Sequence, residues 1–171
     1  MTDKTKFYGK YRGTVTTNVD PMKLGRIMAT VPDVHGFNPS TWALPCVPVA
    51  GVQMGFYAVP PMGANVWIEF EQGDIDHPIW VGCFWGSQTD MPGPALLVTP
   101  GLDAIILQTT LQNTLSISDM AGPTGGIAMK TVSGAMILIN ETGITLSNGQ
   151  GATILLTGPT VSINQTALTV T

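Results

Sequence analysis

The second half of the chain repeats one short pattern: two apolar residues at positions i and i+2, followed by a turn. The pairs are Leu115/Ile117, Ile127/Met129, Ile137/Ile139, Ile144/Leu146, Ile154/Leu156, Val161/Ile163 and Leu168/Val170. Alternation with a period of two places both members of a pair on the same face of a β-strand. The opposite face is mostly Thr, Ser and Asn, so the pattern predicts short strands with one apolar and one uncharged polar face.

Strands of this length cannot cover their own apolar face, and this half contains no predicted helix or second sheet to cover it. A single-chain solenoid needs about 20 or more residues per coil to enclose a core, whereas these pairs recur about every eight residues. Three copies around one axis solve the problem, because each chain supplies one wall, the pairs point inward and strand edges bond to the next chain. The predicted trimer interface, the core of a needle, consists of Ile137, Ile139, Ile144, Leu146, Ile154, Leu156, Val161 and Ile163.

Charge divides the chain into two parts. Residues 96–171 contain only Lys130, Asp103, Asp119 and Glu141, so the other basic and acidic residues all lie in residues 1–95. A turn-rich stretch, Gly86 to Pro94, separates the parts. We therefore predict a barrel domain in residues 1–86, a linker in 87–95, transition strands at the needle base in 96–126 and the needle in 127–171.

The first half reads as a compact all-β domain. The predicted strands are Lys10–Asn18, Gly25–Val31, Thr41–Val49, Asn65–Glu71 and Pro78–Trp85, each bounded by Pro, Gly, Asn or Asp. Such short strands without a helical period favour a small Greek-key barrel of the OB type. The predicted fold is all-β: an N-terminal OB-fold barrel followed by an intertwined triple-stranded β-helix in a homotrimer.

Composition adds three expectations. The net charge of −4 argues against a nucleic-acid partner, because such proteins present a basic face to phosphates. The first residues lack the apolar core of a signal peptide, so we expect synthesis in a cytoplasm. Cys46 and Cys83 have apolar neighbours and no CxxC spacing. We interpret them as buried reduced thiols, with a disulfide or a reactive thiol as the alternative.

Candidate chemical groups have simpler interpretations. Paired carboxylates can hydrolyse glycosides, but a turn rich in Asp and Gly produces the same cluster, which here is Glu69, Glu71, Asp74 and Asp76. His77 has no second ligand at metal-binding spacing. Ser116, Ser133 and Ser147 have no partner His nearby in the sequence. We predict no catalytic, cofactor-binding or metal-binding residue, and no enzyme activity.

Two further patterns could bind ligands. Stacking on Trp42, Trp67, Trp80 and Trp85 would suit a sugar or nucleobase, although tryptophans more often form a core or a subunit contact. The glycine-rich stretch Asp119–Gly126 lacks the Lys-Ser/Thr ending of a phosphate-binding loop, and a turn between strands accounts for it better.

Several segments of the chain resemble segments of a known family and follow one another in the same order. They are Tyr11–Val15, Asp20-Pro21, Leu24–Ile27, Val31-Pro32, Trp42-Ala43, Pro60–Phe70, Gly73–Pro78, Val81–Trp85 and, in the second half, Gly143–Leu146, Gly151–Leu156 and Val161–Asn164. The chain resembles the baseplate central spike of contractile phage tails, baseplate assembly protein V. Relatives of that family are the valine-glycine-repeat spikes of type VI secretion and the spikes of extracellular contractile injection systems.

This resemblance implies a trimer on the axis below a tail tube, docked on a hub protein and driven into a target cell envelope when the sheath contracts. It implies a virion tail baseplate or an extracellular contractile particle, assembled in a bacterial cytoplasm. Some members carry a lysozyme domain after the barrel, for which the linker leaves no room. Others bind iron with a His-x-His pair, which is missing here. A tip protein of the PAAR type seated on Leu168, Val170 and Thr171 is the expected alternative.

Two other functions stay open at this point. The barrel could be a binding module for a glycan or an oligonucleotide, with the repeat as a trimeric stalk. The chain could also cleave cell-wall polysaccharide, although a groove of carboxylates is hard to build from the three acids of the repeat half.

Overall fold

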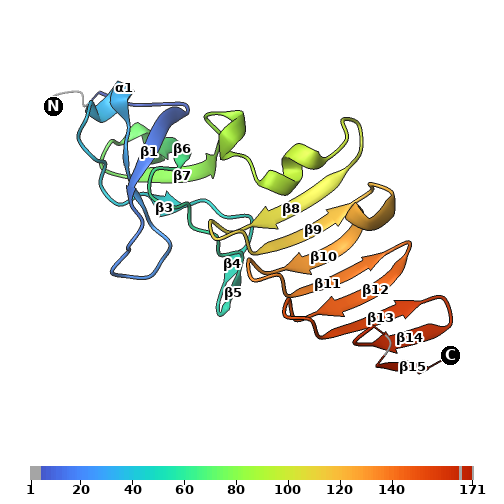
Figure 1. Cartoon of the computed structure of the whole chain (residues 1–171). Coiled ribbons are helices and arrows are strands. Elements are labelled where there is room, and N and C mark those ends of the chain that lie inside the picture. The colour runs from blue at the N-terminus through green and yellow to red at the C-terminus, as the bar shows by residue number, and fades with distance from the viewer. Residues whose placement is uncertain (1–4, 166, 171) are drawn as a thin grey trace. The chain divides into compact units, whose positions relative to one another are not determined.

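A computed structural model describes residues 5–165 and 167–170. The chain forms two compact units, Met1–Gln88 and Thr89–Thr171 (Figure 1). In each unit the regular secondary structure consists mostly of short strands. Within the described ranges, no helix reaches the length and apolarity that crossing a membrane requires.

The N-terminal unit contains one main sheet. Its elements are β1 (Tyr11–Thr17), β2 (Met28–Thr30), α1 (Pro32–His35), β3 (Leu44–Pro45), β4 (Ala50–Gly51), β5 (Met54–Gly55), β6 (Asn65–Phe70), η1 (Glu71–Gly73) and β7 (Pro78–Cys83), and η2 (Gln88–Asp90) lies at the boundary of the two units. The sheet has five strands in the order β2-β1-β6-β7-β3, and β4 pairs with β5 in a separate hairpin. A bridge between Ile27 and Ala43 links the β2 edge to the segment that enters β3, so the sheet curls into a half-barrel.

Three of the predicted strands match β1, β6 and β7, whereas the region between β1 and β6 differs. The predicted strand Thr41–Val49 shrinks to β3, because Pro45 and Pro48 have no N–H to donate to a ladder. Only Met28–Thr30 of the predicted strand Gly25–Val31 is regular. The short helix α1, which was not predicted, begins at Pro32, whose fixed φ suits a first helical turn.

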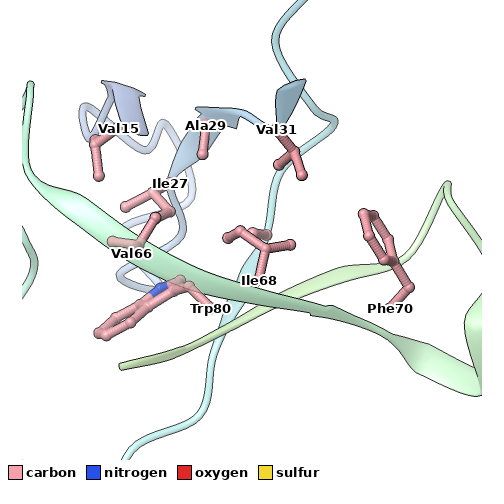
Figure 2. Close-up of a cluster of buried hydrophobic side chains, with 9 residues drawn as sticks. Val15, Ile27, Ala29, Val31, Val66, Ile68, Phe70 and Trp80 are labelled. Atoms are coloured by element: carbon pink, nitrogen blue, oxygen red, sulfur yellow. The ribbon is translucent and has the colours of Figure 1, made fainter. Parts of the chain in front are cut away.

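The core of this unit lies on one face of β1, β2 and β6 and includes Trp80 of β7 (Figure 2). In β6 every second residue is buried, as a strand with one covered face requires. The core side chains are at most 6% exposed, and they are Val15, Ile27, Ala29, Val31, Ala43, Val66, Ile68, Phe70 and Trp80. The prediction of buried thiols was wrong: Cys46 and Cys83 are both free and exposed. Partial burial still raises the pKa of the Cys83 thiol.

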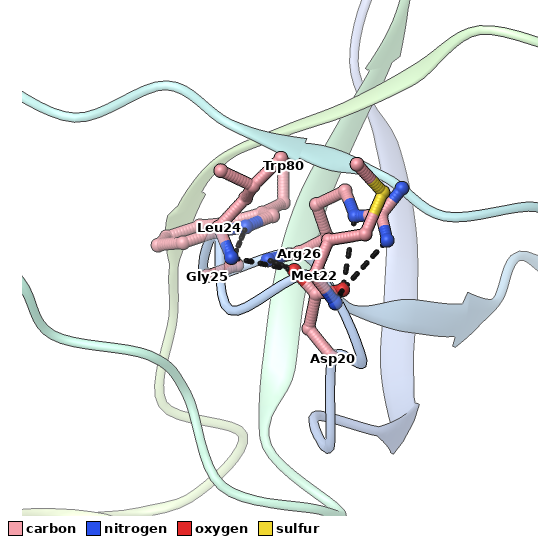
Figure 3. Close-up of polar contacts among 6 residues, drawn as sticks. All are labelled: Asp20, Met22, Leu24, Gly25, Arg26 and Trp80. Atoms are coloured by element: carbon pink, nitrogen blue, oxygen red, sulfur yellow. Dashed lines mark hydrogen bonds and ion pairs between the residues drawn. The ribbon is translucent and has the colours of Figure 1, made fainter.

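An Asp–Arg pair organises the turn between β1 and β2 (Figure 3). The Asp20 carboxylate accepts hydrogen bonds from the backbone N–H groups of Met22 and Leu24, at 3.0 and 2.8 Å, and from the Arg26 guanidinium. The Asp20 side chain is only 3% exposed. The hydrogen bond from Arg26 holds the pKa of Asp20 far below its usual range. This turn places the Gly25 carbonyl where it accepts a hydrogen bond of 3.1 Å from Trp80 Nε1, so the pair also supports the core.

We expect Asp20→Asn to lower the melting temperature of the N-terminal unit at neutral pH, because the amide keeps the shape but loses the charge that binds Arg26. Since the folded-state pKa of Asp20 is depressed, its contribution is complete above about pH 4 and declines as the pH falls below the unfolded value. The wild type should therefore lose more stability than Asp20→Asn between pH 5 and pH 2. Tryptophan fluorescence reports this unit selectively, because all four tryptophans lie in it.

The exposed Asp33, in the first turn of α1, supplies the matched control. Asp33→Asn should keep the melting temperature and the pH profile of the wild type. An Asp20→Asn profile with the wild-type slope would contradict the role given to the Asp20–Arg26 pair.

The C-terminal unit is a single antiparallel meander (Figure 1). Its elements are η3 (Gly93–Leu97), β8 (Ala104–Gln108), β9 (Thr114–Ser118), η4 (Gly122–Thr124), β10 (Gly126–Lys130), β11 (Met136–Asn140), β12 (Gly143–Ser147), β13 (Thr153–Thr157), β14 (Thr160–Ile163) and β15 (Leu168–Val170). Each strand pairs with its neighbours in the sequence, from β8 at one end of the sheet to β15 at the other. Segment 96–126, predicted as a transition, contains β8 and β9, which continue this sheet without a break in register.

Backbone hydrogen bonds join successive strands of the repeat within one chain. We expected the strand edges of the repeat to bond to another chain, but the ladders from β8 to β15 form within the chain. The connections are short enough for hairpins, in which an antiparallel neighbour is the next strand of the same chain. One chain thus builds a whole wall, and what the wall leaves uncovered is its apolar face.

Candidate functional site

The apolar pairs of the repeat form two continuous rows across the C-terminal sheet. Their members lie opposite one another in successive strands, as in Leu146 opposite Ile154 and Ile154 opposite Ile163. The first row is Ile105, Ile117, Ile127, Ile139, Ile144, Leu156 and Val161, and the second is Leu107, Leu115, Met129, Ile137, Leu146, Ile154, Ile163 and Leu168. We call these residues the apolar face.

In the single chain the apolar face is open to solvent. Ile105 is 62% exposed, Ile127 43% and Ile154 39%, whereas core residues of the N-terminal unit are at most 6% exposed. A shallow hollow of about 480 Å³ lies over Ile137, Leu146, Ile154 and Ile163. Contiguous apolar surface of this kind marks an interaction site, because its exposure to water is unfavourable.

The predicted needle-core residues all lie on the apolar face. Ile137 lies opposite Leu146 and Ile139 opposite Ile144, across β11 and β12. The remaining four, Ile154, Leu156, Val161 and Ile163, pair across β13 and β14. Of the predicted tip residues, Leu168 is 54% exposed and pairs with Ile163, and the Val170 backbone pairs with Val161. Thr171 lies outside the described residues.

Reasoning from the sequence missed the first pair of the apolar face, Ile105 and Leu107 in β8. Ile106 lies between them, so the segment is a continuous apolar run that hides the alternation. The register shows which residues belong together, because Ile105 lies opposite Ile117 and Leu107 opposite Leu115. The spacing of i and i+2 was present and could have been found by extending the pattern toward the N-terminus.

The acidic cluster of the N-terminal unit is a turn held by its own polar groups. Glu69 forms an ion pair with Lys10 across the sheet. Asp74 Oδ1 accepts a hydrogen bond of 3.1 Å from the Asp76 N–H, and the backbone of Glu71 and His77 closes the reversal between β6 and β7. His77 Nδ1 lies 3.8 Å from Asp74 Oδ2. In the ranges that the structure describes, no three His, Cys, Asp or Glu side chains gather as a metal site would require.

The tryptophans do not form a common platform. Trp80 belongs to the core, while the Arg26 guanidinium lies 5.2 Å from the centre of the Trp42 ring. Trp67 packs against Phe84 at 4.7 Å, with Arg12 above both rings. Trp85 is 60% exposed. Each aromatic ring thus has separate surroundings, unlike a stacking surface for successive bases or sugars.

The serines and histidines considered for catalysis lie in different units. Ser116 and Ser147 belong to β9 and β12, and Ser133 Oγ lies 2.8 Å from Thr131 Oγ1 in a turn. His35 packs against Phe70 in the N-terminal unit, at 5.9 Å between ring centres. Burial lowers the pKa of His35, and the charge of Asp76 opposes this shift in part. The glycine-rich stretch Asp119–Gly126 connects β9 to β10 and ends on the first residue of β10, as the turn interpretation predicted.

Comparison with known families matches both units. Residues 11–85 match the OB domain of type VI secretion system and phage-baseplate injectors. Residues 104–169 match the C-terminal trimerisation domain of phage baseplate V. No curated protein matches the chain. The chain therefore belongs to the phage baseplate V spike family, structural proteins of a tail baseplate, with an injector OB domain followed by a domain that assembles as a homotrimer.

Proposed function

We propose that this protein is the piercing central spike of a contractile machine. The observation that carries the proposal is the apolar face: a sheet whose strands are already paired within one chain, with a broad apolar surface left open. A trimerisation domain needs such a surface, because burying each half-exposed aliphatic side chain contributes about 1 kcal/mol. Summed over the face and over three chains, this stabilises a rigid assembly.

In the proposed arrangement, three sheets surround one axis as the walls of a triple-stranded β-helix, with their apolar faces inward. The outward faces carry many Thr, Ser and Asn residues, and residues 96–171 contain only four charged side chains, so the shaft is nearly uncharged. Closed ladders and a buried core resist unravelling, because pulling on one strand must break the hydrogen bonds of its neighbours. These are the mechanical properties that a needle driven along its axis requires.

The remaining parts of the proposal follow from the family. The OB domain docks on the tail hub, and the end formed by β15 receives a tip protein of the PAAR type. Synthesis and assembly take place in a bacterial cytoplasm. Sheath contraction then drives the spike into the envelope of the target cell. Neither a cofactor nor a nucleic acid takes part.

We also propose that the chain is mechanical and not enzymatic. Glu69 and the turn acids are engaged in an ion pair and in turn hydrogen bonds, which is how structural carboxylates behave. Purified trimer incubated with peptidoglycan should release no reducing sugar above a heat-denatured sample. Release that disappears on Glu69→Gln would identify a glycosidase instead.

Two measurements on the full-length protein test the spike. Native mass spectrometry should give a particle of three chains; a monomer would exclude the proposed arrangement. Machines assembled with the wild-type chain should depolarise target cells on contraction. Machines of normal length that carry a chain truncated before β13 should contract without depolarising them, and equal depolarisation would exclude the piercing role.

A further inference from the structure

The four charged residues of the second half are sorted between the two lateral edges of the C-terminal sheet. Asp103 precedes β8, Asp119 follows β9 and Glu141 follows β11, and in this meander these three positions lie along the same edge. The Asp119 N–H donates a hydrogen bond of 3.0 Å to the Asp103 carbonyl, which confirms that these two residues are adjacent. We call this side, with its connections 119–125 and 141–142, the acidic edge.

The opposite edge carries Lys130 and side-chain amides. Lys130 ends β10 and lies opposite Thr114 and Met136, next to the turns 109–113 and 131–135. The turn 148–152 lies farther along the same edge, between β12 and β13. Asn113 Oδ1 accepts a hydrogen bond from the Val132 N–H, and Asn148 Oδ1 accepts two from its own turn. Because the amide oxygens are used within the wall, the NH₂ groups are what these side chains offer to a partner. We call this side the amide edge.

A ring of three walls brings these unlike edges together. In cyclic threefold symmetry every seam is heterologous, so the left edge of one copy meets the right edge of the next. Given the proposed arrangement, on which this inference rests, each seam joins an acidic edge to an amide edge. Carboxylates thus face an ammonium and amide donors, and like charges stay apart.

The order of the strands sets the level at which Lys130 meets its partners. β10 lies between β9 and β11 in the sheet, and neighbouring strands are about 4.8 Å apart. At the acidic edge Asp119 directly follows β9 and Glu141 directly follows β11. Because β10 lies between these strands, one carboxylate lies on each side of β10 along this edge. A lysine side chain spans roughly one strand spacing. We propose that Lys130 of each copy forms ion pairs with Asp119 and Glu141 of the next copy.

One observation within the single chain supports this pairing. Lys130 is exposed, and in the described part of the chain the recorded ion pairs involve other residues.

The test is a double-mutant cycle on the full-length trimer. Lys130→Glu is made both in the wild type and in the D119N/E141Q variant. Urea dissociation is followed by sedimentation velocity at low salt, because urea does not screen charge. Lys130→Glu should raise the dissociation constant of the wild-type trimer about threefold for each seam, or roughly 30-fold for the three seams together. In the background without the two carboxylates, the same substitution should have little effect, and added salt should reduce the wild-type effect.

The possible outcomes distinguish a failure of the Lys130 ion pairs from a failure of the trimeric arrangement. An equal loss in both backgrounds, or no loss in the wild type, would show that Lys130 does not face the acidic edge. A wild-type particle that does not contain three chains would overturn the proposed arrangement instead. Lys130→Gln, which removes the charge without reversing it, should give an intermediate loss that also disappears in the D119N/E141Q background.

Discussion

An Ile154→Asp chain should fail to form a trimer and should sediment as a monomer. Ile154 lies in the second row of the apolar face, between Leu146 and Ile163. In the proposed arrangement the substitution places three carboxylates near one axis, and each buried charge without a partner costs several kcal/mol. The combined penalty is about 10 kcal/mol or more, which exceeds what the rest of one strand contributes. Native mass spectrometry at micromolar concentration measures the result directly.

Leu155, the next residue in β13, is a closely matched control. Ile154 and Leu155 are 39% and 41% exposed in the single chain, so an isolated sheet should tolerate Asp equally at both positions. They point to opposite faces, because successive strand residues alternate. Leu155→Asp, and likewise Thr153→Asp on the same face, should therefore leave the trimer intact. Loss of the trimer in all three variants, or in none, would refute the assignment of the faces.

Gly143→Ala should destabilise the C-terminal sheet by a few kcal/mol. Gly143 begins β12 with φ at 143°, and a Cβ atom there would lie 2.0 Å from the Leu156 carbonyl oxygen of β13. No side-chain movement relieves a clash with backbone, so the two strands must separate and lose ladder hydrogen bonds. The unfavourable φ costs about 1–2 kcal/mol, and the lost hydrogen bonds add about 1 kcal/mol each. Far-UV circular dichroism in urea should show an early transition, while tryptophan fluorescence stays unchanged.

Gly151 allows the steric cost to be separated from the conformational cost. Its φ is also positive, at 103°, but a Cβ atom there meets nothing within 4 Å. Gly151→Ala should therefore cost only about 1–2 kcal/mol for the backbone conformation. If both variants lowered the urea midpoint equally, the close approach of β12 and β13 would not be the reason for glycine at position 143.

The rows of the apolar face illustrate what periodicity can predict. Alternation over strands such as Ile137–Ile139 and Ile144–Leu146 reveals which side chains share a face, because the geometry of a strand has a period of two. It does not reveal which backbone groups pair. The prediction of hydrogen bonds to another chain therefore failed, although the apolar face itself was found.

Burial was harder to predict where the chain lacks regular structure. Cys46 has apolar neighbours in sequence but lies in a segment where Pro45 and Pro48 interrupt the strand, and it is exposed. The Asp20–Arg26 pair also had no local signal, because five residues separate the two side chains in the sequence and the turn brings them together. Such contacts depend on how the chain folds back.

The sequence alone determined that this chain has two different halves, that the second has one apolar and one polar face, and that it lacks anything to cover the apolar face. These properties are local, since they follow from residue type and a spacing of two. Only the tertiary structure decided that one chain builds a complete wall. It also decided that the acidic residues of the second half and Lys130 lie on opposite edges of that wall. That sorting depends on the direction in which each strand crosses the sheet, which the folded hairpins set.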